Sequence, residues 1–176
     1  TRDKPQFEPF RDFIEGDPAA VLIVEFLSEE DTDLTPQVDR LENDLRRQGL
    51  GYHFHRAPAP QAQAHIWGLR RAALGLSMSQ RGDAKAISFV EDTAVAPDRL
   101  RDYIERFMEI LEAQNLTAGF YAHASVGLLH IRPVVNLKTS DGVEKFRRVA
   151  ELVAELVLEF GGALSGEHGD GLVRAP

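Results

Sequence analysis

Two separate stretches of the sequence carry side chains that can bind a metal ion or transfer a proton, residues 119–132 and residues 161–171. The first contains His123 and His130, and the second contains Glu167. A tight turn between the two histidines predicts a hairpin, which places both imidazoles on one face of a sheet. Imidazoles from adjacent strands are a common beginning of a zinc site. The spacing therefore predicts a metal site that the second stretch completes.

The second stretch offers both a third ligand and a proton acceptor. Glu167 follows Gly166, and such a glycine-rich backbone allows a ligand to approach closely. Two histidines and one glutamate leave a fourth coordination position open, which is typical of catalytic rather than structural zinc sites. His168 is the candidate general base, because imidazole exchanges its proton near neutral pH.

The same residues also allow a simpler interpretation. A histidine pair in a hairpin is more often hydrogen-bonded than metal-bound, and Gly-Glu-His-Gly is also a plausible flexible turn. Arg132 can hold a substrate carboxylate or cap a sheet edge, while Arg70 and Lys85 are by default solvated surface residues. Spacing alone leaves these alternatives open.

Composition narrows the class of protein. The chain has 176 residues, 43% of them hydrophobic and 27% charged, which is the size and balance of one globular domain with its own core. The net charge of −8 argues against a nucleic-acid surface. No apolar run reaches the roughly 20 residues that span a bilayer, so no transmembrane segment is expected. There is no cysteine, which excludes disulfides and thiolate metal sites and fits a cytoplasmic protein.

The chain lacks an initiator methionine, so we expect it to be a piece of a longer protein. Hydrophobic periodicity and turn residues predict its secondary structure. Helices are expected at residues 6–15, 35–49, 60–80, 97–114 and 143–160, and strands at residues 20–27, 52–56, 84–90, 117–122, 128–135 and 163–165.

The order αβαβαβαββαβ with one clear hairpin predicts an α+β fold of the ferredoxin-like kind, in which an antiparallel or mixed sheet carries helices on one face. A doubly wound parallel sheet is the alternative. No glycine-rich turn joins a first strand to a helix, so the dinucleotide fingerprint of that fold is missing.

Several separated motifs, in order, resemble one known family. Residues 120–133 (Phe-Tyr-Ala-His-Ala-Ser-Val-Gly-Leu-Leu-His-Ile-Arg-Pro) and 165–171 (Ser-Gly-Glu-His-Gly-Asp-Gly) are similar to the C-terminal, substrate-side domain of FAD-linked oxidases of the vanillyl-alcohol-oxidase type. Residues 89–95 and 67–70 add to the resemblance, which covers the chain from about Asp17 to its end. The family includes D-lactate dehydrogenase, the glycolate oxidase FAD subunit and D-2-hydroxyglutarate dehydrogenase, and the combination is most similar to large bacterial members that join an FAD part to an iron–sulfur part.

The resemblance implies roles for individual residues. His123, His130 and Glu167 match the divalent-metal ligands, usually zinc, and His168 matches the base that takes the substrate hydroxyl proton. Arg70 matches an arginine that grips a substrate carboxylate. Arg132 departs from the pattern, since asparagine is common there, and would favour a carboxylate held by two hydrogen bonds.

The implied reaction is oxidation of a D-2-hydroxy acid such as lactate, glycolate or 2-hydroxyglutarate, by hydride transfer to FAD with metal assistance. The whole chain, residues 1–176, would be one substrate domain, colourless and inactive alone. Its partners would be the FAD-binding domain of the same polypeptide, the hydroxy acid, and an iron–sulfur domain or other electron acceptor. We expect the intact enzyme in the cytoplasm or peripheral to the membrane.

Two other functions fit the residues without the resemblance. A zinc hydrolase would use Glu167 or His168 on a metal-bound water. A metal-free binding module of ferredoxin-like shape would use neither of these two residues for catalysis.

Overall fold

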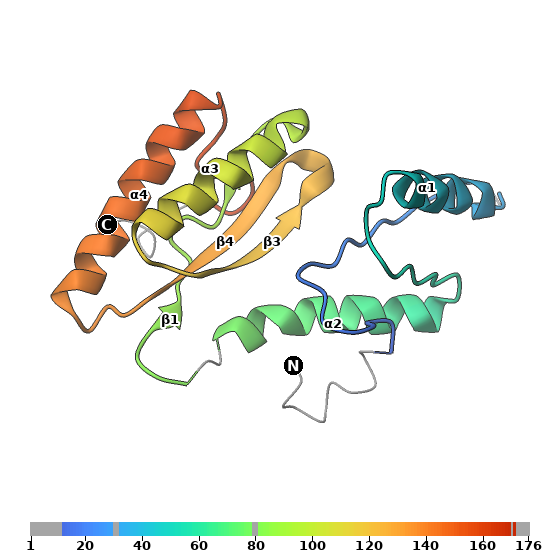
Figure 1. Ribbon diagram of the computed structural model, residues 1–176, viewed down its shortest axis with the longest axis horizontal. Helices are drawn as coiled ribbons and strands as arrows, with labels where there is room; N and C mark the ends of the chain where they lie inside the picture. Colours follow the sequence, from blue (N-terminus) through green and yellow to red (C-terminus); the bar gives the residue numbers. More distant parts are fainter. Residues whose placement is uncertain (1–11, 30–31, 79–80, 170, 172–176) are drawn as a thin grey trace. The chain divides into compact units, whose positions relative to one another are not determined.

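The computed structural model describes most of the chain (Figure 1). The described residues are 12–29, 32–78, 81–169 and 171, without the side chains of 73–78. Contacts divide the chain into two compact units, Thr1–Ala73 and Leu74–Pro176. No helix in the described ranges has both the length and the apolar character needed to cross a membrane.

The first unit contributes two helices, both predicted from the sequence. Helix α1 spans Thr35–Arg47, and α2 begins at Pro60 and continues to Met78. The N-cap residue of α1, Leu34, makes no side-chain cap hydrogen bond, but Asp33 accepts one from the first turn. The backbone N–H of Thr35 donates to Asp33 Oδ1 at 2.9 Å. An oxygen from a residue before the first turn satisfies one of the N–H groups that a helix leaves unpaired.

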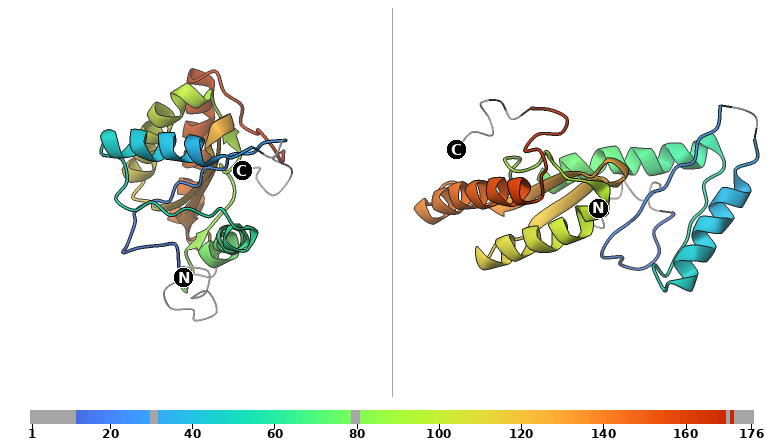
Figure 2. Two further views of the ribbon diagram at one scale, coloured as in Figure 1. Left: turned by 90° about the vertical axis from the view of Figure 1, so that its right-hand side faces the viewer. Right: turned by 90° about the horizontal axis from the view of Figure 1, so that it is seen from above.

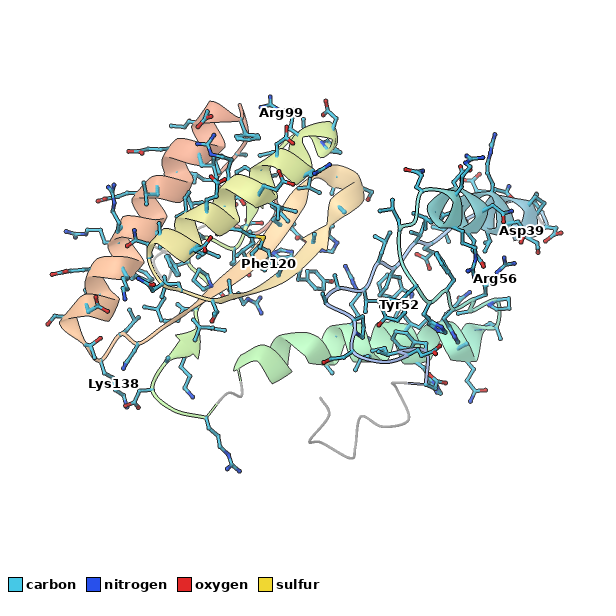
Figure 3. All side chains as sticks on the ribbon, viewed as in Figure 1. Asp39, Tyr52, Arg56, Arg99, Phe120 and Lys138 are labelled. Atoms are coloured by element: carbon cyan, nitrogen blue, oxygen red, sulfur yellow. The ribbon has the colours of Figure 1, made fainter. Side chains whose placement is uncertain are left out.

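Both strands predicted in this unit are wrong. Residues 20–27 and 52–56 are irregular and mostly exposed. Strand propensity needs a hydrogen-bonded neighbour to become a strand, and neither segment pairs with another within the described part of the unit. Arg56 instead fastens the second segment to α1 by donating to Asp39 Oδ1 at 2.6 Å (Figure 3). Of the predicted helix at residues 6–15, only the last four residues are described, and these are a turn at residues 12–13 followed by two irregular residues.

The second unit is built on a small antiparallel sheet, which confirms the α+β class. Its strands are β1 (Lys85–Ala86), β2 (Thr93–Ala94), β3 (Ala118–His123) and β4 (Leu128–Val135). Strands β3 and β4 form the predicted hairpin, with the short helix η3 (Ala124–Val126) in its turn. The strand predicted at residues 84–90 is shorter than expected, since only its first part pairs with β4.

Strand β4 lies in the middle of the sheet. Leu129 pairs with Thr93 of β2 and with Ala122 of β3, so these two strands flank opposite sides of β4. Beyond β2, Ala163 forms an antiparallel bridge to Ala94. The order β2–α3–β3–β4–α4–bridge is the βαββαβ order of a ferredoxin-like fold.

Two amphipathic helices cover one face of this sheet (Figure 2). Helix α3 (Leu100–Ala113) follows the short helix η2 (Pro97–Arg99), and α4 (Ser140–Glu159) follows β4. Both lie within a few residues of their predicted bounds, because their apolar side chains recur every three to four positions. Their buried residues join those of the sheet in one core: Phe89, Val90, Val95, Tyr103, Phe107, Leu111, Leu129, Ile131, Val135, Val149, Val153, Leu156 and Val157.

Strand β4 separates this core from the opposite face of the sheet. Successive side chains of a strand point to opposite faces, so Leu129 and Ile131 face the helices while His130 and Arg132 face away. The candidate residues of the hairpin therefore lie on the face that α3 and α4 leave uncovered.

Candidate active site

The hairpin presents two histidines and a tyrosine on the uncovered face. Tyr121 is directly opposite His130, and His123 is the diagonal neighbour, since it pairs with Leu128. The imidazole centroids of His123 and His130 are 5.3 Å apart. The tyrosine ring stands beside both of them, at 5.5 Å and 5.4 Å. The expectation that both imidazoles share one face is met, though they are diagonal rather than directly opposite.

The turn of the hairpin depends on Gly127. This residue has φ +70°, a left-handed conformation that side-chain-bearing residues rarely adopt. Its Cα also lies against β2, where an added Cβ would overlap the carbonyl oxygen of Val95. The N–H of Val95 donates to the Gly127 carbonyl at 3.0 Å, so the turn is joined to the sheet at this point.

The second stretch reaches the hairpin because it runs along β2. After the bridge at Ala163, the N–H of Gly166 donates to the carbonyl of Asp92 at 2.8 Å. Gly166 has no room for a side chain, since a Cβ would press on Leu128 and Ala94. This close approach carries the following residues, Glu167 and His168, over the end of the sheet.

Glu167 meets the histidines on the uncovered face. Its Oε2 atom lies 3.9 Å from His123 Nε2, 3.5 Å from His130 Nε2 and 3.5 Å from His168 Nε2. The ring of His168 stacks on that of His130, with centroids 5.2 Å apart and planes 7° from parallel. The structure thus brings together the four residues that the sequence singled out for metal binding and proton transfer, although they come from positions up to 45 residues apart in the printed sequence.

The donor atoms suit a divalent cation. One ligand atom each from His123, His130 and Glu167 lies within 4.8 Å of the others. Tetrahedral ligands at about 2.1 Å from a zinc ion are about 3.4 Å from one another. The separations of 3.5 Å and 3.9 Å between Glu167 and the imidazoles approach this value and exceed the usual length of an N–H···O hydrogen bond.

A backbone carbonyl group fixes the orientation of the His130 ring. Its Nδ1 atom lies 2.8 Å from the carbonyl oxygen of Glu91. Because a carbonyl only accepts, Nδ1 is the donor, and in the neutral ring the lone pair is on Nε2, the nitrogen that faces Glu167. In metal sites, the ring nitrogen of a histidine that does not bind the metal usually makes such a hydrogen bond, which orients the imidazole.

Two buried carboxylates, Glu91 and Asp92, belong to the site and were missed by the sequence reasoning. Their exposed fractions are 3% and 1%. Ionised side chains are almost never buried without partners. The signal was available, since two adjacent acids directly follow the apolar residues 84–90, but it did not show what the acids contact.

Asp92 accepts hydrogen bonds from the loop that carries Glu167 and His168. Ser165 Oγ donates to Oδ2 at 2.6 Å, the His168 N–H donates to Oδ2 at 2.8 Å, and the Glu167 N–H donates to Oδ1 at 3.1 Å. Burial by itself would raise the pKa of Asp92. The hydrogen bonds from Ser165 and from the two amides, together with the nearby His168, outweigh burial and hold that pKa below its ordinary value.

Glu91 contacts two of the predicted residues. Arg132 donates to Glu91 Oε2 through Nη2 at 2.9 Å and through Nε at 3.3 Å. The other oxygen, Oε1, lies 3.4 Å from His168 Nδ1. The carboxylate that Arg132 holds in this structure is thus the protein's own, and its binding of a substrate carboxylate stays a prediction.

The two other predicted substrate residues belong to other elements. Lys85 pairs with Val135, five residues along β4 from His130, which is roughly 16 Å at about 3.3 Å per residue. Arg70 lies on α2 in the first unit, with its guanidinium 5.0 Å from the centroid of Trp67. The substrate contacts predicted for both residues stay predictions.

Comparison with known proteins gives one family. The description "FAD linked oxidases, C-terminal domain" matches residues 3–176. A D-2-hydroxyglutarate dehydrogenase of Haemophilus influenzae is 43% identical over 107 residues, which are 61% of this chain and 10% of that protein. The protein of the same name in Pseudomonas putida is 32% identical over 154 residues, 85% of this chain and 15% of that protein. The glycolate oxidase subunit GlcD of Bacillus subtilis is 26% identical over 107 residues, 61% of this chain and 22% of that protein. The chain therefore spans a small part of the length of these relatives.

Proposed function

This chain belongs to the family of FAD-linked oxidase C-terminal domains, and from this premise we propose that it is the substrate-side domain of a flavoenzyme that oxidises a D-2-hydroxy acid to a 2-oxo acid. The observation that carries the proposal is the meeting of His123, His130, Glu167 and His168 on the uncovered face of the sheet. This group combines a ligand set for a cation with an imidazole outside that set. An alcohol oxidation by hydride transfer needs both, because the hydroxyl must lose a proton as its carbon loses a hydride.

The first requirement is a positive charge at the substrate oxygen atoms. His123, His130 and Glu167 would hold a divalent cation, and their donor types favour zinc, whose charge when bound polarises the substrate hydroxyl and carboxylate. The chain's own contribution is to bring the three donor atoms together at one place on the sheet. Two come from the hairpin, and the third comes from the loop fastened to β2.

The second requirement is an acceptor for the hydroxyl proton, which we assign to Nε2 of His168. Its Nδ1 atom faces Glu91 Oε1 at 3.4 Å. A carboxylate only accepts, so this contact favours the tautomer with the proton on Nδ1 and a lone pair on Nε2. Nε2 lies 3.5 Å from Glu167 Oε2, on the side where the substrate oxygen would sit. The proton leaves to His168 as the hydride leaves C2 of the substrate.

The hydride acceptor would come from another part of the protein. FAD, bound mainly by a domain of the same polypeptide, supplies the ring that takes the hydride. We assign no flavin-binding residue within this chain. An iron–sulfur domain or another acceptor would then reoxidise the flavin. Because relatives that are 32% to 43% identical carry the name D-2-hydroxyglutarate dehydrogenase, D-2-hydroxyglutarate is the first substrate to test, ahead of D-lactate and glycolate.

The test uses the intact protein that contains this chain. We expect anaerobic D-2-hydroxyglutarate to bleach the flavin absorbance while the L-enantiomer does not. We expect His123→Ala to remove the bound metal and to lower kcat/KM by on the order of 100-fold or more. His65→Ala, the same change at a half-exposed histidine of α2, is the matched control and should leave both unchanged.

Two results would contradict the proposal. The first is flavin that no D-2-hydroxy acid reduces. The second is a His123→Ala protein that keeps full turnover. If the metal-loaded protein hydrolyses ester or amide substrates instead, a zinc hydrolase is the better description. If the intact protein binds no metal and shows no turnover, a binding module is the better description of this chain.

A further inference from the structure

Asp92 holds the backbone of the loop that carries Glu167 and His168. The side chain of Glu167 is 51% exposed, and His168 is also exposed although its ring stacks on that of His130. Their backbone N–H groups, by contrast, both donate to the carboxylate of Asp92, at 3.1 Å and 2.8 Å. Ser165 adds its hydroxyl from the other side of the loop at 2.6 Å.

The chemistry of this contact requires a carboxylate. Three donors converge on the two oxygens of one buried side chain, and an ionised carboxyl group is an acceptor at both oxygens. Hydrogen bonds to an ionised acceptor are about twice as strong as neutral ones. An asparagine would present N–H₂ in place of one oxygen and face one of the donors with another donor. Ser165 extends the arrangement, because its Oγ atom also accepts from the N–H of Gly169 at 2.7 Å.

Glu91, the residue before Asp92, positions His130 of the hairpin. The carbonyl of Glu91 accepts from His130 Nδ1, while the side chain of Asp92 accepts from the loop. The dipeptide of residues 91–92, between β1 and β2, therefore positions His130 of β4 relative to Glu167 and His168 of the loop. A shift of the loop by one ångström would change the distance from Glu167 Oε2 to His130 Nε2, which is 3.5 Å.

We propose that Asp92 is a positioning residue of the site, which holds the Glu167–His168 loop against the histidines of the hairpin through three hydrogen bonds. Asp92, Glu167 and His168 also form a group that could hold a metal, but the proposal assigns Asp92 no role as a ligand, because its two oxygens already accept the hydrogen bonds of the loop. Its effect is exerted through the backbone of the loop. The part of this inference that concerns metal affinity rests on the function proposed above, whereas the part that concerns loop order does not.

The test substitutes Asp92→Asn in the full chain and uses zinc alone as the probe. We expect zinc affinity, measured by competition with a chromophoric chelator, to fall by about 10- to 100-fold, as for other residues that support metal ligands. We expect the amide hydrogens of Glu167, His168 and Gly169 to exchange about tenfold faster or more, while those of α3 and α4 keep their rates. Asp98→Asn, the same chemical change at an exposed residue of η2, should alter neither quantity.

A second pair of variants covers the case in which Asp92→Asn does not fold. Ser165→Ala removes one of the three donors and is expected to weaken zinc binding and loosen the loop in the same direction, by a smaller factor. Ser165→Thr keeps the hydroxyl and should restore both values. A threonine that behaves like the alanine would overturn the proposal.

The two readouts separate failure of this inference from failure of the proposed function. If the unsubstituted chain binds no zinc, the metal part of the proposed function fails, and the exchange rates alone decide the role of Asp92. If zinc binds and Asp92→Asn leaves both affinity and loop exchange within twofold of the unsubstituted chain, Asp92 does not position the loop and the inference is wrong.

Discussion

Arg132 and Glu91 form an ion pair on the uncovered face of the sheet, 2.9 Å from Nη2 to Oε2, although 41 residues separate them in the sequence. Glu91 is 3% exposed and Arg132 is 16% exposed on its side chain. The pair fills the space beside His130 and brings a positive charge next to a carboxylate that would otherwise be costly to bury.

Breaking this ion pair on one side is expected to destabilise the fold more than removing it altogether. Arg132→Asn leaves the buried Glu91 carboxylate without its guanidinium and should lower the free energy of unfolding by about 3 kcal/mol. Adding Glu91→Gln removes the uncompensated charge, so the double variant should recover part of that loss. Urea unfolding of the two single variants and the double variant measures the coupling. Additive effects would mean that the pair contributes nothing as a pair.

Loss of the proposed base should reduce turnover without releasing the metal. His168→Gln in the intact enzyme is expected to lower kcat by about 100- to 10,000-fold, the usual contribution of a positioned proton acceptor. The metal content should stay that of the unsubstituted enzyme if the ligands are His123, His130 and Glu167, as proposed, and not one of the two other groups that could hold a metal, both of which include His168. Steady-state kinetics and metal analysis on the same preparation check both statements. A variant with near-normal kcat, or one that loses its metal, would remove His168 from this role. His65→Gln is the matched control.

Substitution of Gly127 should disturb the join between the hairpin and β2. Gly127→Ala combines a left-handed φ of +70° with overlap of the new Cβ and the Val95 carbonyl oxygen. We expect a loss of about 3 kcal/mol in the free energy of unfolding. Gly161→Ala separates the two causes, since Gly161 has φ +64° but nothing within 4 Å of the added carbon. That variant should cost only about 1 kcal/mol. Equal losses in thermal or urea unfolding would show that the overlap is relieved at no cost.

The core should lose stability at high pH because of Tyr103. Burial raises the pKa of Tyr103 from 10.0 to about 12, and the nearby hydroxyl of Thr93 opposes the rise. The unfolded chain therefore ionises this phenol first as the pH increases. Stability that is complete below pH 10 is lost progressively between pH 10 and about pH 12, by roughly 3 kcal/mol in all.

Tyr103→Phe provides the measurement for this pH effect. The variant should show a weaker dependence of urea-unfolding stability on pH above 10 than the unsubstituted chain does. At neutral pH, Tyr103→Phe is expected to change stability by less than about 1 kcal/mol. The hydroxyls of Tyr103 and Thr93 are buried without a hydrogen-bond partner in the described part of the chain, so little is lost with the oxygen. An unchanged alkaline profile would contradict the assignment.

The parts of the fold that the sequence predicts well are those fixed by local pattern. Helices α3 and α4 repeat apolar residues at helical spacing, and the β3–β4 hairpin has a glycine at the one turn position that needs it. Residues 20–27 have the composition of a buried strand, yet they are exposed and unpaired among the described residues. Pairing depends on a distant segment, and composition does not specify that segment.

The same difference between local pattern and distant contacts applies to the candidate site. His123 and His130 could be placed on one face because a hairpin fixes their register. Glu167 could be named as a third ligand, but its approach depends on the bridge at Ala163 and on Asp92, contacts that cross some 70 residues. The acids of residues 91 and 92 were visible in the sequence as charges only. Their partners, Arg132 and the loop amides, become apparent only when the chain is folded.

The alternation along β4 has a consequence for how proteins with this sheet can diverge. Leu129 and Ile131 are packed in the core, and the residues that alternate with them along β4 are not part of it. Substitutions on the uncovered face therefore leave the packing between the sheet and the helices unchanged. At Arg132 they still cost stability, because the buried Glu91 carboxylate loses its partner.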